Sequence, residues 1–431
     1  MAGETSKNRA MPAWYSEGLE HIWLPYAQMK TVSPPLPVVR THGARIVLAD
    51  GRELIDGIAS WWTACHGYNH PHIRQAVESQ LDRMPHVMFG GLAHEQAFTL
   101  AQRLTNLLPG DLSRVFFSDS GSVAVEVAMK MAVQYWINRG RPKKTRFMAF
   151  KHGYHGDTQG AMSVTDRAIG MHDVFREAFP QYDIVDPGAD PIRDLAAIDR
   201  YLDQHAGEYA GIIIEPLVQG AGGMVFRSKN LLRLLRQAAD KAEQILIFDE
   251  IFTGFGRTGT MFACEQATVT PDIMTLSKAL TGGTLPLAAT IATRKVFDAF
   301  CSDDPAHALM HGPTYMANAL ACAAANASLD LFEREPRLSQ VADIAAALER
   351  GLSPCRGLPR VKDVRVKGAI GVVELDRIAD LNALRARFIE QGVFIRPIAN
   401  VIYLTPAFTI ASDELQTLID AVVRTVREFK T

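Results

Sequence analysis

From about residue 95 onward, short apolar runs alternate with helix-like stretches. The runs have the length of strands and are apolar along their length, as in strands covered on both faces. Helix-like segments such as Val123–Gln134 and Asn230–Lys241 lie between them. This alternation predicts an α/β fold, with a mostly parallel sheet and helices on both of its faces. The predicted strands are Arg114–Ser118, Phe147–Phe150, Gly211–Leu217, Ile245–Ile251, Ile273–Leu276 and Ala288–Ala292.

The chain has 431 residues, which at roughly 150 residues per domain predicts two or three domains. We assign residues 61–330 to a large domain that contains the sheet. After about residue 318 the chain is helical through Arg350, and short strands follow near Val361–Val366 and Ile370–Leu375. A terminal helix runs from about Ser412 to Phe429, with acidic residues in its first turn. We assign residues 331–431 to a smaller α+β domain.

Residues 1–60 form an N-terminal segment that we expect to join the smaller domain. Prolines between positions 34 and 37 mark an extended connection. Beyond them, Arg45–Leu48 and Glu53–Asp56 flank Asp50-Gly51, a pair that suits a tight turn. This pattern predicts a β-hairpin.

The composition argues against several classes of partner. The formal net charge is -2 and no block of Lys and Arg is present, which argues against nucleic acid or an anionic membrane. The five cysteines are scattered, which indicates reduced thiols rather than a disulfide framework or a zinc site. The N-terminus lacks the order of a signal peptide, and no apolar run reaches about 18 residues. We therefore expect a cytoplasmic protein without a metal site.

Ligands of open α/β sheets bind beyond the carboxyl ends of the strands, so the residues that follow each strand are informative. Ser118-Asp119-Ser120-Gly121-Ser122 follows one predicted strand and precedes a helix. Free N–H groups at such a helix start suit a phosphate, although an ordinary capped turn is the alternative. Tyr154 follows the next strand and offers a flat face for an aromatic ligand, or simply packs in the core.

Two ionisable residues end further strands. Asp249 ends an apolar strand, where a carboxylate is costly unless it meets a cation such as a protonated pyridine nitrogen. The alternative is a structural carboxylate that caps a loop or pairs with Arg257. Lys278 follows Ile273–Leu276, where burial or a nearby phosphate site would lower its pKa and make it a nucleophilic amine. The alternative for Lys278 is an ordinary surface lysine.

Taken in order, these motifs resemble the class III (ω-) aminotransferases. The resemblance rests on Ser-Gly-Ser before a helix and on three longer segments: His152-Gly-Tyr-His-Gly156, Phe248-Asp-Glu-Ile-x-Thr-Gly-Phe-Gly-Arg-Thr-Gly259 and Ser277-Lys-Ala-Leu-x-Gly-Gly283. It covers the chain from about residue 18 to the end. It implies the fold type I architecture, pyridoxal 5'-phosphate as cofactor and a homodimer.

The resemblance also implies roles for single residues. Gly121 and Ser122 would bind the cofactor phosphate, and Tyr154 would stack on the ring. Asp249 would pair with the ring nitrogen. Lys278 would hold the cofactor as a Schiff base and carry the proton during catalysis. Lys278, Asp249 and Tyr154 are thus the expected catalytic residues.

Four further segments resemble the branch of this family that acts in biotin synthesis. These members convert 8-amino-7-oxononanoate to 7,8-diaminononanoate, with S-adenosylmethionine as amino donor. The matching segments are His21–Tyr26, Ser60–Pro71, His311–Tyr315 and Gly392–Pro397. By the same resemblance, Pro313 and Thr314 reach the cofactor phosphate of the other subunit of the dimer.

The resemblance places the substrate site at residues from several of these segments. A planar arginine suits a carboxylate, and flat tryptophan walls suit an apolar chain or an adenine. Paired tryptophans in a core and Arg396 in a structural ion pair are the alternatives. The implied substrate residues are Tyr26, Trp61, Trp62, Tyr154, Asp157, Arg257, Gly312 and Arg396.

The sequence leaves the amino donor and the exact activity open. Relatives that use lysine as donor tend to carry Phe at the position of Tyr26, so Tyr26 favours S-adenosylmethionine. The alternatives are a lysine-using enzyme and another ω-amino-acid or diamine aminotransferase. A binding protein that retained the fold is a third alternative, against which the presence of both Asp249 and Lys278 argues.

Overall fold

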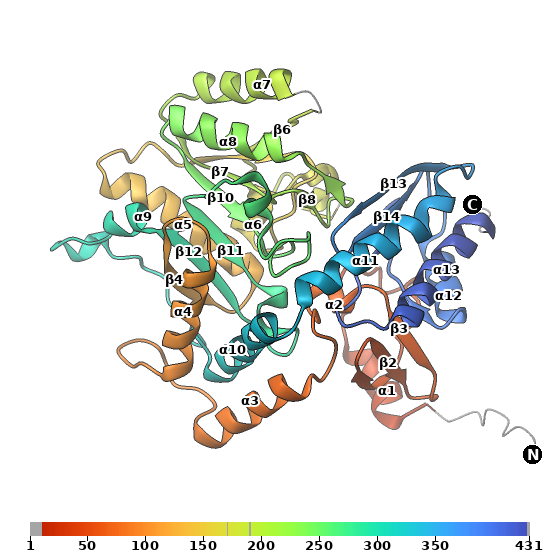
Figure 1. Cartoon of the computed structure of the whole chain (residues 1–431). Helices are drawn as coiled ribbons and strands as arrows, with labels where there is room; N and C mark the ends of the chain where they lie inside the picture. Colours follow the sequence, from red (N-terminus) through yellow and green to blue (C-terminus); the bar gives the residue numbers. More distant parts are fainter. Residues whose placement is uncertain (1–10, 170, 189–190, 429–431) are drawn as a thin grey trace, which may run out of the picture.

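The computed structural model describes residues 11–169, 171–188 and 191–428 (Figure 1). Among these residues, the largest element is a seven-stranded sheet with the order β4-β12-β11-β10-β7-β5-β6. β10 pairs in parallel with β7 and β11, and β5 with β6 and β7. β12 runs antiparallel to both of its neighbours. The predicted α/β fold with a mostly parallel sheet is confirmed. The strands are β4 (Leu112–Ser118), β5 (Arg146–Phe150), β6 (Asp183–Val185), β7 (Tyr209–Ile214), β10 (Ile245–Asp249), β11 (Ile273–Leu276) and β12 (Ala288–Thr293).

The apolar character of the central strands explains how the sheet is covered. In β10, Ile245 and Ile247 pack in the cluster that contains helix α5, whereas Leu246 and Phe248 pack on the opposite face with helix α8. This division follows the two-residue period of a strand. Each such side chain contributes about 1.5–3 kcal/mol when it is fully buried. The helices around the sheet are α3 (Pro71–Arg83), α4 (Glu95–Leu107), α5 (Gly121–Asn138), α6 (Gln159–Ser163), α7 (Pro191–Gln204), α8 (Lys229–Lys241), α9 (Arg294–Asp298) and α10 (Ala319–Arg334).

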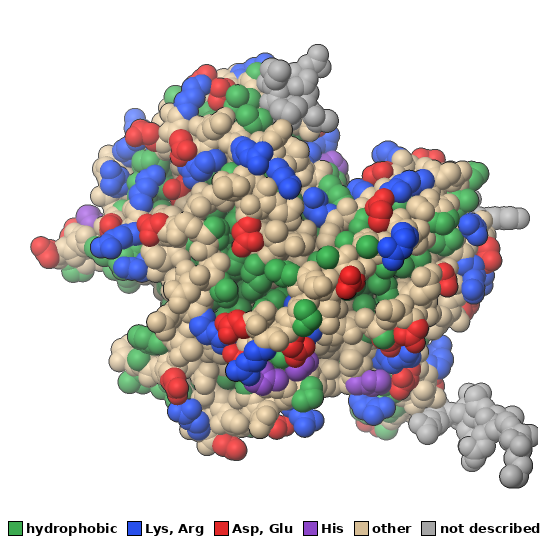
Figure 2. Space-filling model, viewed as in Figure 1, with side chains coloured by type: hydrophobic (Ala, Val, Ile, Leu, Met, Phe, Trp, Pro, Cys, Tyr) green, Lys and Arg blue, Asp and Glu red, His purple; other side chains and the backbone are tan. Residues whose placement is uncertain are grey.

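The two ends of the chain build a second lobe, in which red and blue segments lie side by side on the right of Figure 1; the same lobe lies on the right of the space-filling view in Figure 2. A four-stranded sheet has the order β1-β2-β3-β15, and β15 pairs in parallel with β3. The predicted hairpin is present, because Arg45–Leu48 pairs antiparallel with Glu53–Asp56. A separate three-stranded sheet has the order β13-β14-β16. The domain boundaries themselves stay a prediction.

The elements of this lobe come from both chain ends. They are α1 (Ala13–Gly18), β1 (Val38–His42), β2 (Arg45–Leu48), β3 (Glu53–Asp56), α11 (Arg337–Leu352), β13 (Val361–Lys367), β14 (Ile370–Leu375), α12 (Leu381–Glu390), β15 (Val393–Phe394), β16 (Val401–Leu404) and α13 (Ser412–Glu428). The predicted end of the last helix, Phe429, lies outside the described residues.

Shorter elements connect these parts. They are α2 (Ala59–Trp62), β8 (Val218–Gln219), β9 (Val225–Phe226) and the 3-10 turns Leu19–His21, Arg167–Ile169, Asp173–Phe175, Ala263–Ala267, Lys278–Thr281, Pro305–His307 and Ser353–Cys355.

The structure corrects three details of the predicted strands. β7 ends at Ile214 and not at Leu217, because Pro216 has no N–H to donate to a neighbouring strand. β10 ends at Asp249, where the chain turns into a loop. β4 lies at the sheet edge and is partly exposed, so the expectation of burial on both faces is wrong for this strand.

Two further searches cover the described part of the chain. None of its helices combines the length and the apolar character needed to cross a membrane. No group of three or more His, Cys, Asp or Glu side chains there is placed so that it could hold a metal ion.

Candidate functional site

A cavity of about 150 Å³ lies at the carboxyl ends of the central strands, beside the start of α5. Four strands that are neighbours in the sheet each supply an ionisable residue at this edge: Tyr154 after β5, Glu215 after β7, Asp249 at the end of β10 and Lys278 after β11. Sequence analysis predicted this convergence for all of them except Glu215. The cavity is lined by Trp62, Gly121, Ser122, Tyr154, His155, Gly156, Glu215, Ala221, Asp249, Ile251, Phe252, Ser277 and Lys278.

One end of the cavity is the N-terminus of α5. The helix begins at Gly121, and the Oγ of Ser120 accepts a hydrogen bond from the N–H of Val123 at 3.3 Å. The remaining N–H groups of a first helical turn are free to bind an anion. Gly156 faces this turn so closely that a Cβ on it would lie 2.2 Å from the Oγ of Ser122. The backbone therefore forms a cradle that fits a phosphate group.

Tyr154 stands at the side of the cavity and is held at both ends. Its N–H donates to a carboxylate oxygen of Glu215 at 3.0 Å. Its phenol donates to Oδ1 of Asp157 at 3.0 Å, and its ring stacks on the ring of His172 with centroids 5.9 Å apart. Burial raises the pKa of this phenol, so Tyr154 stays neutral. Its orientation suits contact with a planar ligand.

Asp249 is buried and pairs with a histidine rather than an arginine. Its Oδ2 lies 2.7 Å from Nδ1 of His155, and its Oδ1 accepts hydrogen bonds from the N–H of Ile251 at 3.1 Å and the hydroxyl of Thr275 at 3.2 Å. The alternative pairing with Arg257 is wrong, because the guanidinium of Arg257 donates instead to carbonyl oxygens. His155, Ile251 and Thr275 thus fix the carboxylate of Asp249 in the cavity wall. These hydrogen bonds leave it able to accept one more, from a donor in the cavity.

His155 is a residue that the sequence reasoning did not select, although its motif was noted. Its side chain is fully buried, and among the described residues its Nε2 has no hydrogen-bond partner. A histidine in the same strand-end motif as Tyr154 was the available signal. Its contact with Asp249 adds a proton-bearing group behind the carboxylate.

Lys278 lies opposite Asp249 in an apolar part of the cavity. Its Nζ lies 4.3 Å from the ring centroid of Trp62 and 5.9 Å from that of Phe252. Burial lowers the pKa of this amine to about 8, while the charges of Asp249 and Glu215 act in the opposite direction. From the sequence we expected burial or a nearby phosphate site to lower the pKa of Lys278, and burial is its largest cause. The amine is therefore a usable nucleophile and proton carrier near neutral pH.

Glu215 was missed, although the signal that selected Asp249 applies to it equally. It directly follows an apolar strand, and it is buried in the cavity wall. It accepts hydrogen bonds from the N–H groups of Tyr154 at 3.0 Å and Gly220 at 2.9 Å. Burial raises its pKa to about 7. Its role is to fix the loops that carry Tyr154 and Gly220.

The predicted substrate residues Tyr26, Trp61, Asp157 and Arg396 gather near Tyr154. The phenol of Tyr26 lies 3.2 Å from that of Tyr154 and also donates to Asp157. The rings of Tyr26 and Trp61 lie 6.3 Å apart, and the guanidinium of Arg396 lies 5.5 Å from the ring centroid of Trp61. These residues come from distant parts of the chain and form one polar and aromatic group beside the cavity.

An unusual backbone separates the roles of the two tryptophans. Residues 59–62 all have positive φ angles, so α2 is a left-handed turn. Such angles are costly for residues other than glycine and occur where tertiary structure enforces them. Trp62 is buried beside Lys278, whereas Trp61 is 37% exposed. The prediction of a paired aromatic wall is thus refined: one ring lines the cavity and the other lies near Arg396.

The two predicted substrate arginines differ in their surroundings. Arg396 is half-buried, and in the described part of the chain it makes no ion pair or hydrogen bond. The alternative of a structural ion pair therefore has no support among these residues. Arg257 is buried, donates to the carbonyl oxygens of Pro406 at 2.8 Å and Ala369 at 3.2 Å, and has a pKa that burial lowers to about 10. Its position fits a structural role at least as well as contact with substrate.

Gly312, Pro313 and Thr314 do not line the cavity of their own chain. They lie in the connection between β12 and α10, beside His311, whose Nδ1 is 3.1 Å from Nζ of Lys130 on α5. The structure of one chain therefore does not bring these residues together with Lys278.

Comparison with known proteins matches these features to one family. The family model for class III aminotransferases matches residues 26–426. Adenosylmethionine-8-amino-7-oxononanoate aminotransferase from Mycobacterium leprae is 46% identical over 415 residues, with 94% of each chain covered.

Solved structures agree with this match. A protein of the same name from Methanocaldococcus jannaschii superposes with a TM-score of 0.90 at 32% identity, over 97% of this chain and 99% of that chain. An amine transaminase from an uncultivated Pseudomonas species, in its PLP-bound form, superposes with a TM-score of 0.85 at 33% identity, over 94% of this chain and 98% of that chain.

The lowered pKa of Lys278 predicts its reactivity toward a small acylating reagent. After dialysis against hydroxylamine, which removes carbonyl compounds from lysines, labelling by acetic anhydride should rise about tenfold per pH unit and level off above about pH 8, where the amine is neutral. In protein unfolded in urea the same lysine returns to its ordinary pKa of 10.5, so labelling should continue to rise beyond that point. Mass spectrometry of the Lys278 peptide measures labelling against pH in the folded and in the unfolded protein. Identical pH profiles would contradict the lowered pKa of Lys278 in the folded protein.

Proposed function

Because the chain belongs to the class III aminotransferases, we propose that it transfers an amino group from S-adenosylmethionine to the ketone of 8-amino-7-oxononanoate, yielding 7,8-diaminononanoate for biotin synthesis. The observation that carries this proposal is the cavity in which Lys278, Asp249 and the α5 N-terminus converge beside Arg396 and Trp61. Relatives with this activity in their names, matched over 94% of the chain, support the substrate pair.

The cavity fits pyridoxal phosphate, the cofactor of this family. We propose that Gly121 and Ser122 hold its phosphate at the start of α5 and that Tyr154 contacts its ring. When bound, the cofactor supplies an electrophilic carbon that accepts the amino group and a ring that withdraws electrons. Asp249, fixed by His155, holds a proton on the ring nitrogen, because a buried carboxylate stabilises an adjacent positive charge.

Lys278 performs the proton transfer in this proposal. Its Nζ carries the cofactor before the substrate amine arrives, and afterwards takes up and returns the α-proton as a general base and acid. A pKa of about 8 keeps both protonation states accessible near neutral pH. Trp62 and Phe252 cover the amine and limit the access of water.

The group beside the cavity is suited to recognise the substrates. The guanidinium of Arg396, which has no ion-pair partner among the described residues, offers a planar pair of donors to the carboxylate of 8-amino-7-oxononanoate. Trp61 gives a flat apolar wall, and Tyr26 and Asp157 offer polar groups for the amino donor. One site that handles donor and acceptor in turn implies ping-pong kinetics.

Purified protein with pyridoxal phosphate tests the reaction. It should form 7,8-diaminononanoate from 8-amino-7-oxononanoate with S-adenosylmethionine, as measured by mass spectrometry, and the Lys278→Ala variant should bind cofactor but lose turnover. Lysine, ω-amino acids and diamines serve as competing donors. If lysine supported product formation and S-adenosylmethionine did not, S-adenosylmethionine would be rejected as the amino donor. Product formation by the Lys278→Ala variant would reject Lys278 as the catalytic residue. A protein that stays colourless with cofactor would support the binding-protein alternative.

The role of Arg396 leads to a kinetic prediction. Arg396→Ala should raise KM for 8-amino-7-oxononanoate by about 10- to 150-fold, the range expected when a hydrogen bond to a charged group is lost. Arg387→Ala is the matched control, since Arg387 lies in the same lobe but pairs with Glu428. If both variants keep the parental KM in steady-state kinetics, Arg396 does not bind the substrate carboxylate.

We further propose that the protein acts in the cytoplasm as a homodimer in which Thr314, with Pro313, completes the phosphate site of the partner subunit. Thr314 lies outside the cavity of its own chain. Large apolar side chains near it are solvent-exposed in the single chain, with Met310 81% and Tyr315 58% exposed. Exposed apolar side chains of this size favour a covering partner surface.

Mixed dimers test the shared site. Lys278→Ala and Thr314→Ala chains, carrying different tags and purified as a heterodimer, contain one site with both residues intact if Thr314 acts across the interface. At limiting cofactor, this heterodimer should recover about half of the parental activity, whereas each homodimer stays impaired. Absence of recovery would place Thr314 in the site of its own chain, and an unimpaired Thr314→Ala homodimer would place it in neither site.

A further inference from the structure

The backbone at Lys278 is strained, and the structure around it shows what holds it. Lys278 has a φ of 48°, in the left-handed region, and begins the short turn Lys278–Thr281. A lysine adopts this conformation only where neighbouring groups enforce it. Gly282, which ends the turn, also has a positive φ of 61°, and a Cβ on it would lie 2.7 Å from Ile73. We refer to residues 277–283 as the lysine turn.

The carbonyl group of Ala279, next to Lys278, is where α10 contacts the lysine turn. It accepts a hydrogen bond from the N–H of Gly282 at 2.9 Å within the turn. The hydroxyl of Ser328, fully buried on α10, donates to the same oxygen at 3.4 Å. The thiol of Cys65 approaches it at 3.7 Å. The position of the lysine turn is therefore coupled to Ser328.

Ser328 is oriented in turn by His66, a buried histidine outside the cavity. Nε2 of His66 lies 3.0 Å from the hydroxyl of Ser328, and Nδ1 accepts a hydrogen bond from Nε of Arg337 at 2.9 Å. An arginine can only donate, so Nδ1 must be the acceptor and Nε2 carries the hydrogen. The hydroxyl of Ser328 then accepts from His66 and donates to Ala279.

The surroundings keep His66 in this neutral form. Burial, followed by the positive charges of Arg337 and His70, lowers the pKa of His66 to about 3. Arg337 is itself buried and forms an ion pair with Glu335 at 2.7 Å. The ring of His66 also packs on Phe332 of α10, with centroids 4.7 Å apart. The lowered pKa of His66 therefore agrees with the hydrogen-bond geometry. Arg337 donates to His66, His66 donates to Ser328, and Ser328 donates to Ala279.

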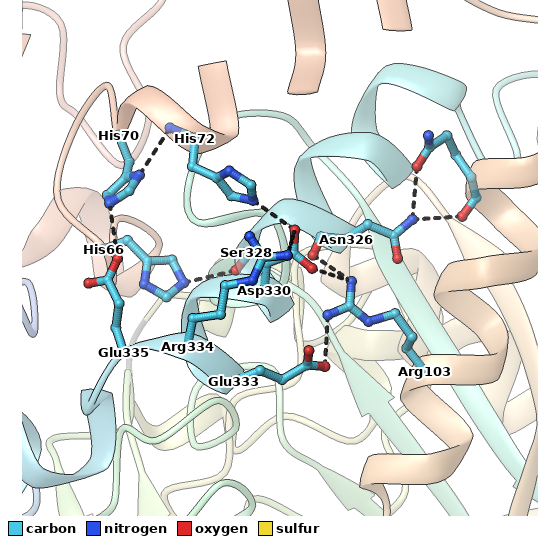
Figure 3. A network of polar contacts seen from close by, with 11 residues as sticks. His66, His70, His72, Arg103, Asn326, Ser328, Asp330, Glu333, Arg334 and Glu335 are labelled. Carbon is cyan, nitrogen blue, oxygen red and sulfur yellow. Dashed lines mark hydrogen bonds and ion pairs between the residues drawn. The ribbon is translucent and has the colours of Figure 1, made fainter. Parts of the chain in front are cut away.

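A second polar branch on α10 serves as an internal comparison (Figure 3). Asp330 binds His72 of α3 at 2.7 Å and Arg103 of α4 at 2.9 Å, and Arg103 also pairs with Glu333 at 2.8 Å. In Figure 3, Asp330 points toward His72 and Arg103, whereas Ser328 points toward His66. In the described part of the chain, Asp330 makes no hydrogen bond or ion pair to the lysine turn.

We propose that Ser328 and His66 are positioning residues for the reaction, which hold the lysine turn so that Nζ of Lys278 stays buried beside Trp62, and that Arg337 selects the tautomer of His66 that this requires. The inference rests on the proposed role of Lys278 as the cofactor-binding amine. It adds a support outside the cavity, formed by helices α10 and α11 and the segment before α3.

The Ser328→Ala variant tests the link. The absorbance of enzyme-bound pyridoxal phosphate changes with the protonation of the nitrogen that joins it to Lys278, so its pH midpoint reports the environment of that nitrogen. Asp249 and Glu215 are the charged groups that face Lys278, and both stay in place in this variant. A relaxed turn admits water to the nitrogen and weakens the effect of burial, so the midpoint should rise, by up to about one pH unit. We also expect kcat to fall about fivefold with KM unchanged.

His66→Asn is the second variant, for the case that Ser328→Ala does not fold. Its side-chain oxygen can still accept from Arg337, but the shorter side chain places no donor at the position of Nε2, which meets Ser328 in the parental protein. The midpoint should again rise. Asp330→Asn is the matched control on the same helix, and it should lower the unfolding temperature without moving the midpoint.

The outcomes separate the two levels of the proposal. If borohydride reduction fixed the cofactor of the parental enzyme to a residue other than Lys278, Lys278 would be rejected as the cofactor lysine and this inference with it. A normal parental titration together with unshifted midpoints in the folded Ser328→Ala or His66→Asn variants would reject the positioning role alone. An equal shift in Asp330→Asn would show a general effect of helix packing and would also overturn it.

Discussion

The site depends on the burial of ionisable groups at one edge of an apolar sheet. Asp249 ends β10 and Lys278 follows the adjacent strand β11, and the side chains of both strands are buried. Charges in such a place are stable only with defined partners. His155 and the Thr275 hydroxyl orient Asp249, while apolar rings surround Lys278 and lower its pKa. The same burial therefore creates both a fixed anion and a reactive amine.

Strained backbone is the second cost of this arrangement, and hydrogen bonds to buried side chains offset it. Residues 59–62 and Lys278 all have positive φ angles, which their side chains disfavour. Asp56 holds the first segment, because its carboxylate accepts from the N–H groups of Ile58 and Ser60, each at 2.8 Å, and from the phenol of Tyr68 at 2.6 Å. Hydrogen bonds to Asp56 and from Ser328, and not the φ preferences of the residues themselves, thus hold the two segments that carry Trp62 and Lys278.

These causes explain what could be predicted from the sequence. Strands buried on both faces leave a local apolar run, so the central strands and the residues at their ends were found. The short strands β1, β6 and β15 were not, because their pairing is set by distant parts of the chain and leaves little local pattern. β16 was also missed, although its four residues are an apolar, buried run. The left-handed turn at Trp61 has no glycine to mark it. Glu215 carried the same signal as Asp249, so its omission was avoidable, whereas the proposed role of Thr314 needs a second chain that one sequence does not describe.

In the proposed function, chemistry and recognition are divided between two parts of the molecule. The large sheet positions Lys278 and Asp249, whereas Trp61 on the connecting turn α2 and Arg396 after β15 lie in the group beside the cavity. β15 pairs in parallel with β3, so Phe394 lies opposite Asp56, and Arg396 and Trp61 follow shortly after these paired positions. The guanidinium and the indole ring meet because two strands from opposite ends of the chain share one register. In the proposed function, a change at Trp61 or Arg396 would alter which carboxylate or ring is accepted, while the hydrogen bonds of Asp249 and the contact of Lys278 with Trp62 would stay as they are.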